Sequence, residues 1–204
     1  MKFKEDTILT YHHINKKSFS YTVSIECFDR QMHIIKEMGF TTLHTGDLRK
    51  AIDDKDLNKK YIMITFDDGW LGSWVYAYPI LKKYGHKAVF FVVSSWCGRG
   101  IKRKRLDDGI PTDIPTHEQC ETMVKEGKMS ECSVSWDEFS EMEASGCVDV
   151  QCHTNSHLMW DNLYSDREER LKKLRHDLLL SKQAIESNLN KTCDCLCWPY
   201  GVYD

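Results

Sequence analysis

The chain has 204 residues, of which 41% are hydrophobic and 29% are charged, with a formal net charge of -3. Such a composition is ordinary for a globular domain, and the small negative charge excludes a strong electrostatic attraction to nucleic acid or to an anionic membrane. We therefore expect a single domain over residues 1–204, no membrane span, and a neutral small molecule or a glycan as the partner.

The amino terminus is charged and has neither the apolar core nor the cleavage site of a signal peptide, so we expect a cytoplasmic protein unless the amino terminus is incomplete. Nine cysteines, none in a Cys-x-x-Cys pair, fit a reducing compartment. Cys193, Cys195 and Cys197 alternate along a predicted strand. We expect them to pack on one face of that strand, because three thiols in line cannot surround a metal ion tetrahedrally.

Strand and helix patterns alternate through the first half of the chain. Strands are predicted over Thr7 to Tyr11, Phe40 to Leu43 and Tyr61 to Phe66, and helices over Ile25 to Met38, about Leu48 to Ile52 and Trp74 to Tyr84. Ser24 can cap the first helix and Gly39 can end it, while Pro79 is expected to kink the last one.

The second half repeats this alternation after one irregular insertion at about 96–133, which has no clear period. The basic run from Lys102 to Arg105 within it is expected to be a solvated face rather than an anion site. Strands are predicted over Ala88 to Val93, Cys147 to Gln151 and Cys193 to Trp198, and helices over Trp136 to Ala144 and Asp166 to Leu189, the latter with an apolar stripe of Leu171, Leu174, Leu178 and Ile185.

Six strands alternating with helices predict an α/β fold with a parallel sheet and helices outside it. In such folds the functional groups lie at the carboxyl ends of the strands. The candidate residues all follow predicted strands: His12, Asp67 and Asp68, His153, and Pro199 with Tyr200. We therefore expect them to meet at one edge of the sheet.

The adjacent acids Asp67 and Asp68 directly follow the apolar strand Ile64-Thr65-Phe66 and precede Gly69. Negative charge at the end of a buried strand is costly unless a cation offsets it or a proton transfer uses it. The two aspartates could instead cap the following helix, but a cap needs only one of them.

His153 and His157 are four residues apart, so in a helical turn both imidazoles would lie on one face. Together with Asp68 they would form a facial set of two nitrogens and one oxygen, which leaves positions open for water and substrate. Two unrelated surface histidines are the simpler alternative. The acid pair and the placement at strand ends favour the metal site.

Thr65-Phe66-Asp67-Asp68-Gly69, His153-Thr154-x-x-His157 and Trp198-Pro199-Tyr200-Gly201 occur in this order. With these three motifs the chain resembles the polysaccharide deacetylases of the NodB-homology family. The resemblance covers nearly the whole chain, and Tyr11-His12-His13 is similar to the branch that deacetylates poly-N-acetylglucosamine.

The resemblance implies that Asp67 is the general base and that Asp68, His153 and His157 bind a divalent metal ion. Zinc suits these ligands, although other divalent metals do so too. In the poly-N-acetylglucosamine branch the catalytic acid corresponds to His12, with His13 as a rival. Trp198, Pro199, Tyr200 and His13 would bind substrate, and the Tyr200 N–H would face the oxyanion. His12 as a packed histidine and Tyr200 as a turn aromatic are the alternatives.

Two departures from the family pattern affect these expectations. The chain ends at Asp204, so the resemblance implies a distorted (β/α) barrel that lacks its C-terminal closing strands. Cys197-Trp198 stands where most members have an arginine before Pro-Tyr, so base orientation by arginine is not expected here.

Three functions are compatible with the sequence. The first is a metal-dependent hydrolase that removes N-acetyl groups from N-acetylhexosamine residues of a glycan. The second is a deacylase or deformylase of a small or lipid-linked amide. The third is a truncated, inactive domain that binds glycan.

Overall fold

The computed structural model describes residues 7–54, 60–100, 102–109 and 113–202. The charged amino terminus, residues 1–6, and the chain end at 203–204 lie outside the described residues. None of the helices in the described part of the chain combines the length and the hydrophobicity needed to cross a membrane.

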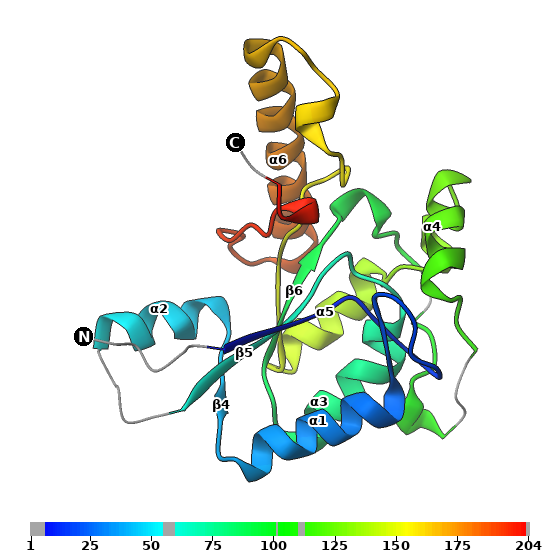
Figure 1. Ribbon diagram of the computed structural model, residues 1–204, viewed down its shortest axis with the longest axis vertical. Helices are drawn as coiled ribbons and strands as arrows, with labels where there is room; N and C mark the ends of the chain where they lie inside the picture. The colour runs from blue at the N-terminus through cyan, green and yellow to red at the C-terminus, as the bar shows by residue number, and fades with distance from the viewer. Residues whose placement is uncertain (1–6, 55–59, 101, 110–112, 203–204) are drawn as a thin grey trace.

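A parallel sheet forms the centre of the molecule, as the alternating pattern predicts (Figure 1). Its strands are β1 Thr7–Tyr11, β4 Thr41–Thr42, β5 Tyr61–Phe66, β6 Ala88–Val92 and β7 Val148–Cys152. They pair in the order β1-β5-β6-β7, with β4 also on β5. The α/β class with a parallel sheet is thus confirmed, whereas closure of these strands into a barrel stays a prediction.

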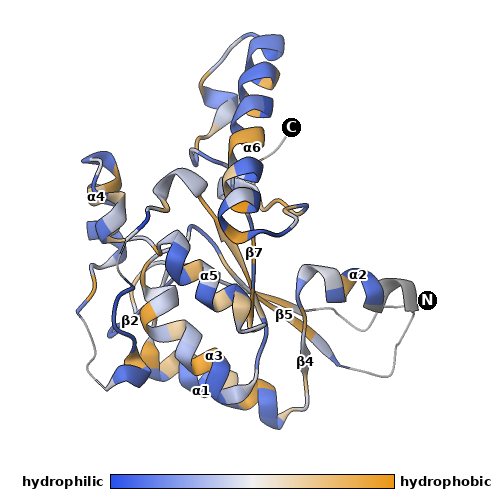
Figure 2. Cartoon of the chain, turned by 180° about the vertical axis from the view of Figure 1, so that it is seen from behind, coloured by the Kyte–Doolittle hydropathy of each residue, from blue (hydrophilic) through white to orange (hydrophobic). Residues whose placement is uncertain are grey.

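Strand β5 is the central strand and is hydrogen-bonded to three others. Strand β1 pairs along one edge, from Thr7 opposite Ile62 to Tyr11 opposite Phe66. The other edge pairs with β4 at its beginning and with β6 at its end. Neighbours on both sides bury β5, which Figure 2 shows as a hydrophobic stretch, and they place Asp67 and Asp68 at a buried strand end.

The last predicted strand, Cys193 to Trp198, is wrong in extent, because it forms only one parallel bridge, between Leu196 and Cys152. The amides of Asp194 and Cys195 donate instead to the side-chain oxygen of Gln151, which ends the ladder. The sequence patterns also missed a small parallel sheet of β2 His13–Asn15 and β3 Thr22–Ser24.

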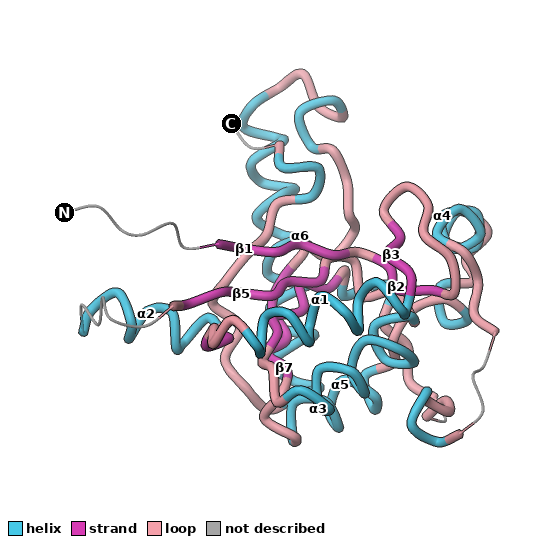
Figure 3. The backbone as a smooth tube through the Cα atoms, turned by 60° about the horizontal axis from the view of Figure 1, so that its bottom comes forward, coloured by secondary structure: helices cyan, strands magenta, loops and turns pink. Residues whose placement is uncertain are grey.

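Six α-helices accompany the sheet in the described residues, and Figure 3 shows α1, α3 and α5 together on one side of the strands. Their bounds are α1 Ile25–Glu37, α2 Thr45–Asp54, α3 Tyr78–Tyr84, α4 His117–Lys125, α5 Trp136–Ala144 and α6 Arg167–Leu189. The predicted caps of α1 are confirmed: the Ser24 hydroxyl accepts from Cys27 N, and Gly39 follows the helix with a φ of 72°.

The helix predicted over Trp74 to Tyr84 is present and changes its form directly before Pro79: Ser73–Ala77 is π-helical, and Pro79 lies in the first turn of α3. Proline fits there because its missing N–H is not needed in the first turn of a helix. Gly72, at the start of the π-helical segment, touches β2 so closely that a Cβ atom would lie 2.1 Å from the Ile14 carbonyl oxygen. Only glycine fits this approach without a shift of the backbone.

The predicted apolar stripe of α6 is right towards the end of the helix and wrong at its start: Ile185 is buried and Leu178 packs against the core, whereas Leu171 is exposed. The buried face also includes the polar residues Asp177 and Ser181, which the stripe did not predict. Asp177 accepts a hydrogen bond from Asn155 N, and Ser181 donates to the Thr154 carbonyl. This polar face of α6 therefore supports the loop that follows β7.

The insertion at 96–133 contains α4, which its irregular pattern did not predict. Its basic run is not a free solvated face either. Arg103 pairs with the buried Glu138 of α5, Lys102 and Arg105 pair with Glu141 of the same helix, and Arg105 lies over the Trp74 ring. These charges attach the insertion to α5.

Candidate active site

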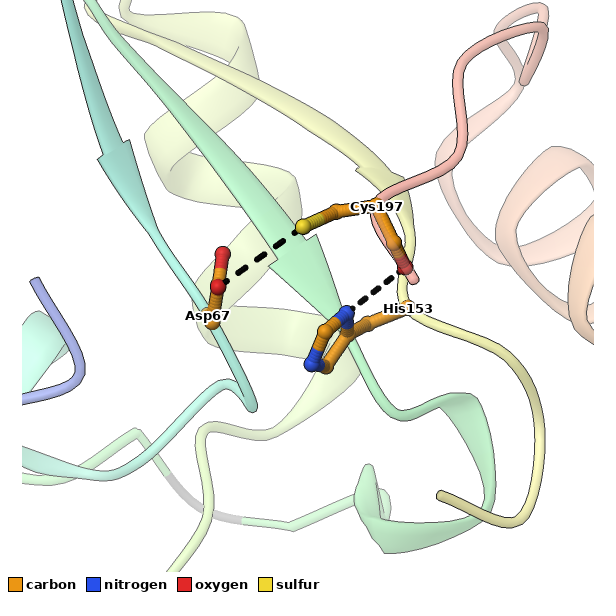
Figure 4. A group of neighbouring side chains, drawn as sticks. All are labelled: Asp67, His153 and Cys197. Atoms are coloured by element: carbon orange, nitrogen blue, oxygen red, sulfur yellow. Dashed lines mark hydrogen bonds between the residues drawn. The ribbon is translucent and has the colours of Figure 1, made fainter. Parts of the chain in front are cut away.

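The carboxyl ends of three strands of the sheet, β1, β5 and β7, bring the predicted residues together. Asp67 and Asp68 follow β5, His12 follows β1, and His153 follows β7. In Figure 4 the side chains of Asp67 and His153 approach one another although 86 positions separate them in the sequence. The arrangement follows from parallel strands, whose carboxyl ends all lie at one edge of the sheet.

The turn after β5 has an uncommon backbone. Asp68 has a φ of 72° and Gly69 a φ of 89°, and Gly69 N donates to the Asp67 carbonyl. Thr154, His157 and Tyr200, which all lie at this edge, also have positive φ values. Positive φ is costly for residues other than glycine, most of all for the β-branched threonine, and it concentrates where a site needs a particular side-chain direction.

Asp68, His153 and His157 form a compact buried group. The Asp68 Oδ1 atom lies 3.2 Å from His157 Nε2 and 3.5 Å from His153 Nε2. Neither approach has hydrogen-bond geometry, and this buried oxygen is without a hydrogen-bond partner among the described residues. Three potential ligand atoms within 4.8 Å of one another, with an orphaned carboxylate oxygen among them, fit a divalent metal ion.

The two histidines converge in a loop and not in the helical turn that would also have placed them on one face. The segment from His153 to His157 is a loop, in which the Thr154 hydroxyl accepts a hydrogen bond from His157 N at 3.0 Å. The bond and the positive φ values turn the chain back, so the imidazole centroids are 5.1 Å apart. The predicted proximity is thus confirmed, and a loop brings it about.

Hydrogen bonds from outside this group fix the orientation of two of its members. Trp70 Nε1 donates to Asp68 Oδ2 at 2.8 Å. His153 Nδ1 lies 2.8 Å from the Cys197 carbonyl oxygen, and because a carbonyl only accepts, Nδ1 carries the proton. The second nitrogen, Nε2, then faces Asp68 as a potential ligand.

The electrostatics of the group favour a bound cation. Burial opposes the charge on Asp68, but the imidazoles of His153 and His157 outweigh burial and hold the pKa of this carboxyl below its usual range. Burial likewise opposes a charge on His153, but Asp68 and Asp67 raise its pKa to about 10. The negative charge at this strand end thus draws either a proton or a metal ion.

Asp67 differs from its neighbour in its partners. Its Oδ1 is buried and has no hydrogen-bond partner in the described part of the chain, and its Oδ2 lies 3.7 Å from Cys197 Sγ. Burial raises the pKa of the Asp67 carboxyl, while the charges of His153 and His12 lower it in part. A buried carboxylate with one free oxygen and a raised pKa is suited to accept a proton.

The structure separates the two candidate acids. His12 is partly exposed, and its ring lies 5.4 Å from that of Tyr21. His13 is fully buried in β2, where its Nε2 lies 3.1 Å from the Pro115 carbonyl oxygen. Burial, with help from the neighbouring His117, lowers the pKa of His13 to about 4. His13 is therefore neutral at pH 7 and faces the insertion rather than open solvent.

The third motif borders the group on its other side. Pro199 is buried, Trp198 is partly exposed, and Tyr200 is 60% exposed with its ring centroid 4.8 Å from that of His157. An exposed aromatic ring beside potential metal ligands is a surface on which a sugar ring can stack.

The three alternating cysteines do not share one face, contrary to the prediction. Cys193 is in the hydrophobic core, Cys195 lies beside Arg49, and Cys197 contacts Asp67. All are free thiols.

Sequence reasoning missed the contacts of Trp70 and Cys197 with the acid pair. Trp70 directly follows the Asp-Asp-Gly motif, and Cys197 directly precedes Trp-Pro-Tyr, so their place next to the motifs was the signal available.

The chain is similar to known polysaccharide deacetylases. The family model described as polysaccharide deacetylase matches residues 54–204. Over 97% of the chain the sequence is 29% identical to YxkH of Bacillus subtilis, whose name assigns it to the polysaccharide deacetylases, and over 88% it is 21% identical to the poly-β-1,6-N-acetyl-D-glucosamine N-deacetylase of Escherichia coli. The chain spans 57% of the length of the first relative and 28% of the second.

A solved structure of similar fold supports the same relationship. It is a de-N-acetylase from Aggregatibacter actinomycetemcomitans, with a TM-score of 0.72 and 25% sequence identity. The superposition covers 97% of this chain and 80% of that one.

Proposed function

This chain belongs to the polysaccharide deacetylase family, and on that premise we propose that it is a metal-dependent hydrolase that removes acetyl groups from N-acetylhexosamine residues of a glycan. One observation carries the proposal. The buried Asp68 Oδ1 faces two imidazole nitrogens at 3.2 and 3.5 Å without a hydrogen bond, next to a second buried aspartate with a free oxygen.

Asp68, His153 and His157 would hold the metal ion, for which zinc is our first choice. When bound, a divalent ion supplies Lewis acidity, which makes a water molecule more acidic and polarises a carbonyl group. Trp70 and the Cys197 carbonyl would keep Asp68 and His153 in the orientation that this binding needs.

Asp67 would act as the general base and take the proton of the attacking water on its free Oδ1. His12 would donate a proton to the departing amine. We assign this role to His12 rather than His13, because His13 is buried against Pro115 and its pKa of about 4 leaves it without a proton to give at pH 7. The Tyr200 N–H would stabilise the developing oxyanion.

Trp198, Pro199 and Tyr200 would form the side of the groove that receives the sugar, with Tyr200 as the exposed ring. Relatives named for poly-β-1,6-N-acetyl-D-glucosamine support a glucosamine polymer as the first substrate to try. A small or lipid-linked amide is the alternative, and we keep it as an outcome of the test.

The test is to load the purified protein with zinc and to measure acetate release from β-1,6-linked N-acetylglucosamine oligomers and from the monomer. We expect release from the oligomers. Release from the monomer alone would support the small-amide alternative. A filled metal site with no release from any acetylated or formylated sugar would show that the chain is not a deacetylase.

A further inference from the structure

Cys197 contacts two residues of the candidate active site, the proposed base Asp67 and the proposed metal ligand His153. Its Sγ lies 3.7 Å from Asp67 Oδ2, and its carbonyl oxygen lies 2.8 Å from His153 Nδ1 (Figure 4). One residue thus contacts the proposed base with its side chain and a proposed metal ligand with its backbone.

The backbone around Cys197 is held in place from β7. Cys197 N donates to the Cys152 carbonyl at 3.0 Å, and Cys152 N donates to the Cys195 carbonyl at 3.1 Å. These two bonds flank the parallel bridge between Cys152 and Leu196. Because His153 directly follows Cys152, the Cys197 side chain has a set position relative to that histidine.

The thiol accounts for the unequal partners of the Asp67 carboxylate. A thiol is a weak donor, and a carboxylate accepts only, so the S–H group donates to Oδ2. This contact is the one side-chain hydrogen bond found for Asp67 within the described residues, and Oδ1 is buried without any. Without the thiol, the carboxylate could rotate about its Cβ–Cγ bond and exchange the two oxygens.

We propose that Cys197 is a positioning residue: its thiol holds the Asp67 carboxylate so that Oδ1 stays free for the proton of the attacking water, while its carbonyl orients His153. The effect of this role on the reaction rate rests on the proposed function. The carbonyl contact is a backbone contact, so a substitution at position 197 tests the thiol alone.

The kinetic test compares Cys197→Ala with Cys197→Ser on zinc-loaded protein. We expect Cys197→Ala to lower kcat roughly three- to tenfold, the effect of losing one hydrogen bond from a weak donor, with KM and zinc content unchanged. Cys197→Ser keeps a donor on a shorter bond and should recover part of kcat. Cys195→Ala, in the same segment but beside Arg49, is the matched control and should retain the parent kcat.

The structural test needs no activity. In crystal structures of zinc-loaded protein we expect the Asp67 carboxylate to rotate or to split into two conformers in Cys197→Ala and to return to one conformer in Cys197→Ser. An unmoved Asp67 in the alanine variant, or a kcat equal to that of the parent, would overturn the role of Cys197. A parent protein that is inactive on every acetylated sugar would refute the proposed function alone, and the position of Asp67 would still decide the role of the thiol.

Discussion

Trp70 Nε1 donates a 2.8 Å hydrogen bond to Asp68 Oδ2, so the indole of the residue two positions on leaves only Oδ1 of this carboxylate to face His153 and His157. Both residues are almost fully buried, and the Trp70 ring is stacked on Trp96. The orientation of the proposed ligand therefore depends on an aromatic core that the insertion helps to build.

Replacing Trp70 by phenylalanine tests this dependence. The ring and its packing remain, but the donor to Asp68 is lost, and the affinity for zinc should fall about 10- to 100-fold, as is typical when such an outer hydrogen bond is removed. Competition with a chelator measures it. Trp74→Phe is the matched control, because Trp74 Nε1 donates at 2.8 Å to the Arg103 carbonyl, and it should leave zinc affinity unchanged. Equal affinities in Trp70→Phe and the parent would contradict the assignment.

Asp67→Asn should abolish acetate release while zinc stays bound. An amide cannot take the proton from water, and loss of a general base costs typically 10²- to 10⁴-fold in rate. Acetate release and metal analysis on the same sample give the two readouts. The exposed Asp161→Asn serves as the control for a changed charge. A substantial residual rate in Asp67→Asn with a full metal site would assign the base elsewhere.

The acid is tested by paired substitutions of the two neighbouring histidines. His12→Gln should lower kcat by about 100-fold or more, because glutamine cannot protonate the leaving amine. His13→Gln should lose much less, since the glutamine amide can still donate to the Pro115 carbonyl. The opposite order of the two kcat values would make His13 the acid.

The burial of His13 also predicts that the stability of the fold depends on pH. Burial lowers its pKa to about 4 in the folded chain, below the ordinary value of 6.5, so between these values only the unfolded chain takes up the proton. The free energy of unfolding should therefore fall as the pH drops from 6.5 to 4, by an amount on the order of 3 kcal/mol from this residue.

Denaturant titrations at several pH values measure this dependence. His13→Gln should have a flatter pH profile between pH 4 and 6.5 than the parent. His33→Gln, on the exposed face of α1, should keep the parent profile. Parallel profiles for His13→Gln and the parent would mean that His13 titrates normally in the folded state.

Gly72→Ala should destabilise the fold. The added Cβ would meet the Ile14 carbonyl oxygen at 2.1 Å, and backbone atoms must shift to relieve it, which costs about 1–3 kcal/mol or more. Gly46→Ala in α2 is the control: nothing lies within 4 Å of its added Cβ, so it should be neutral or slightly stabilising. Equal midpoints of thermal unfolding for Gly72→Ala and the parent would contradict this close packing.

Local pattern was enough to predict the strands that run to the site. Thr7–Tyr11 and Tyr61–Phe66 have the predicted bounds, because hydrophobic periodicity and adjacent turn residues are properties of short segments. Because parallel strands end at one edge of the sheet, the same patterns also predict that Asp67, Asp68 and His153 lie together.

Tertiary contacts decided what periodicity could not. The two histidines converge through a loop braced by Asp177 and Ser181 of α6, and the amides after Cys193 bond to the Gln151 side chain instead of extending a strand. Such partners are distant in the sequence, so no local pattern encodes them.

The sequence by itself determined which acids and histidines lie at the strand ends. Only the tertiary structure decided which partner holds each of them. Trp70 donates a hydrogen bond to Asp68, the Cys197 thiol donates one to Asp67, and the Pro115 carbonyl accepts one from His13. The physical reason is that a residue's type limits what it can donate or accept, whereas its role depends on the one partner that packing brings within hydrogen-bond distance.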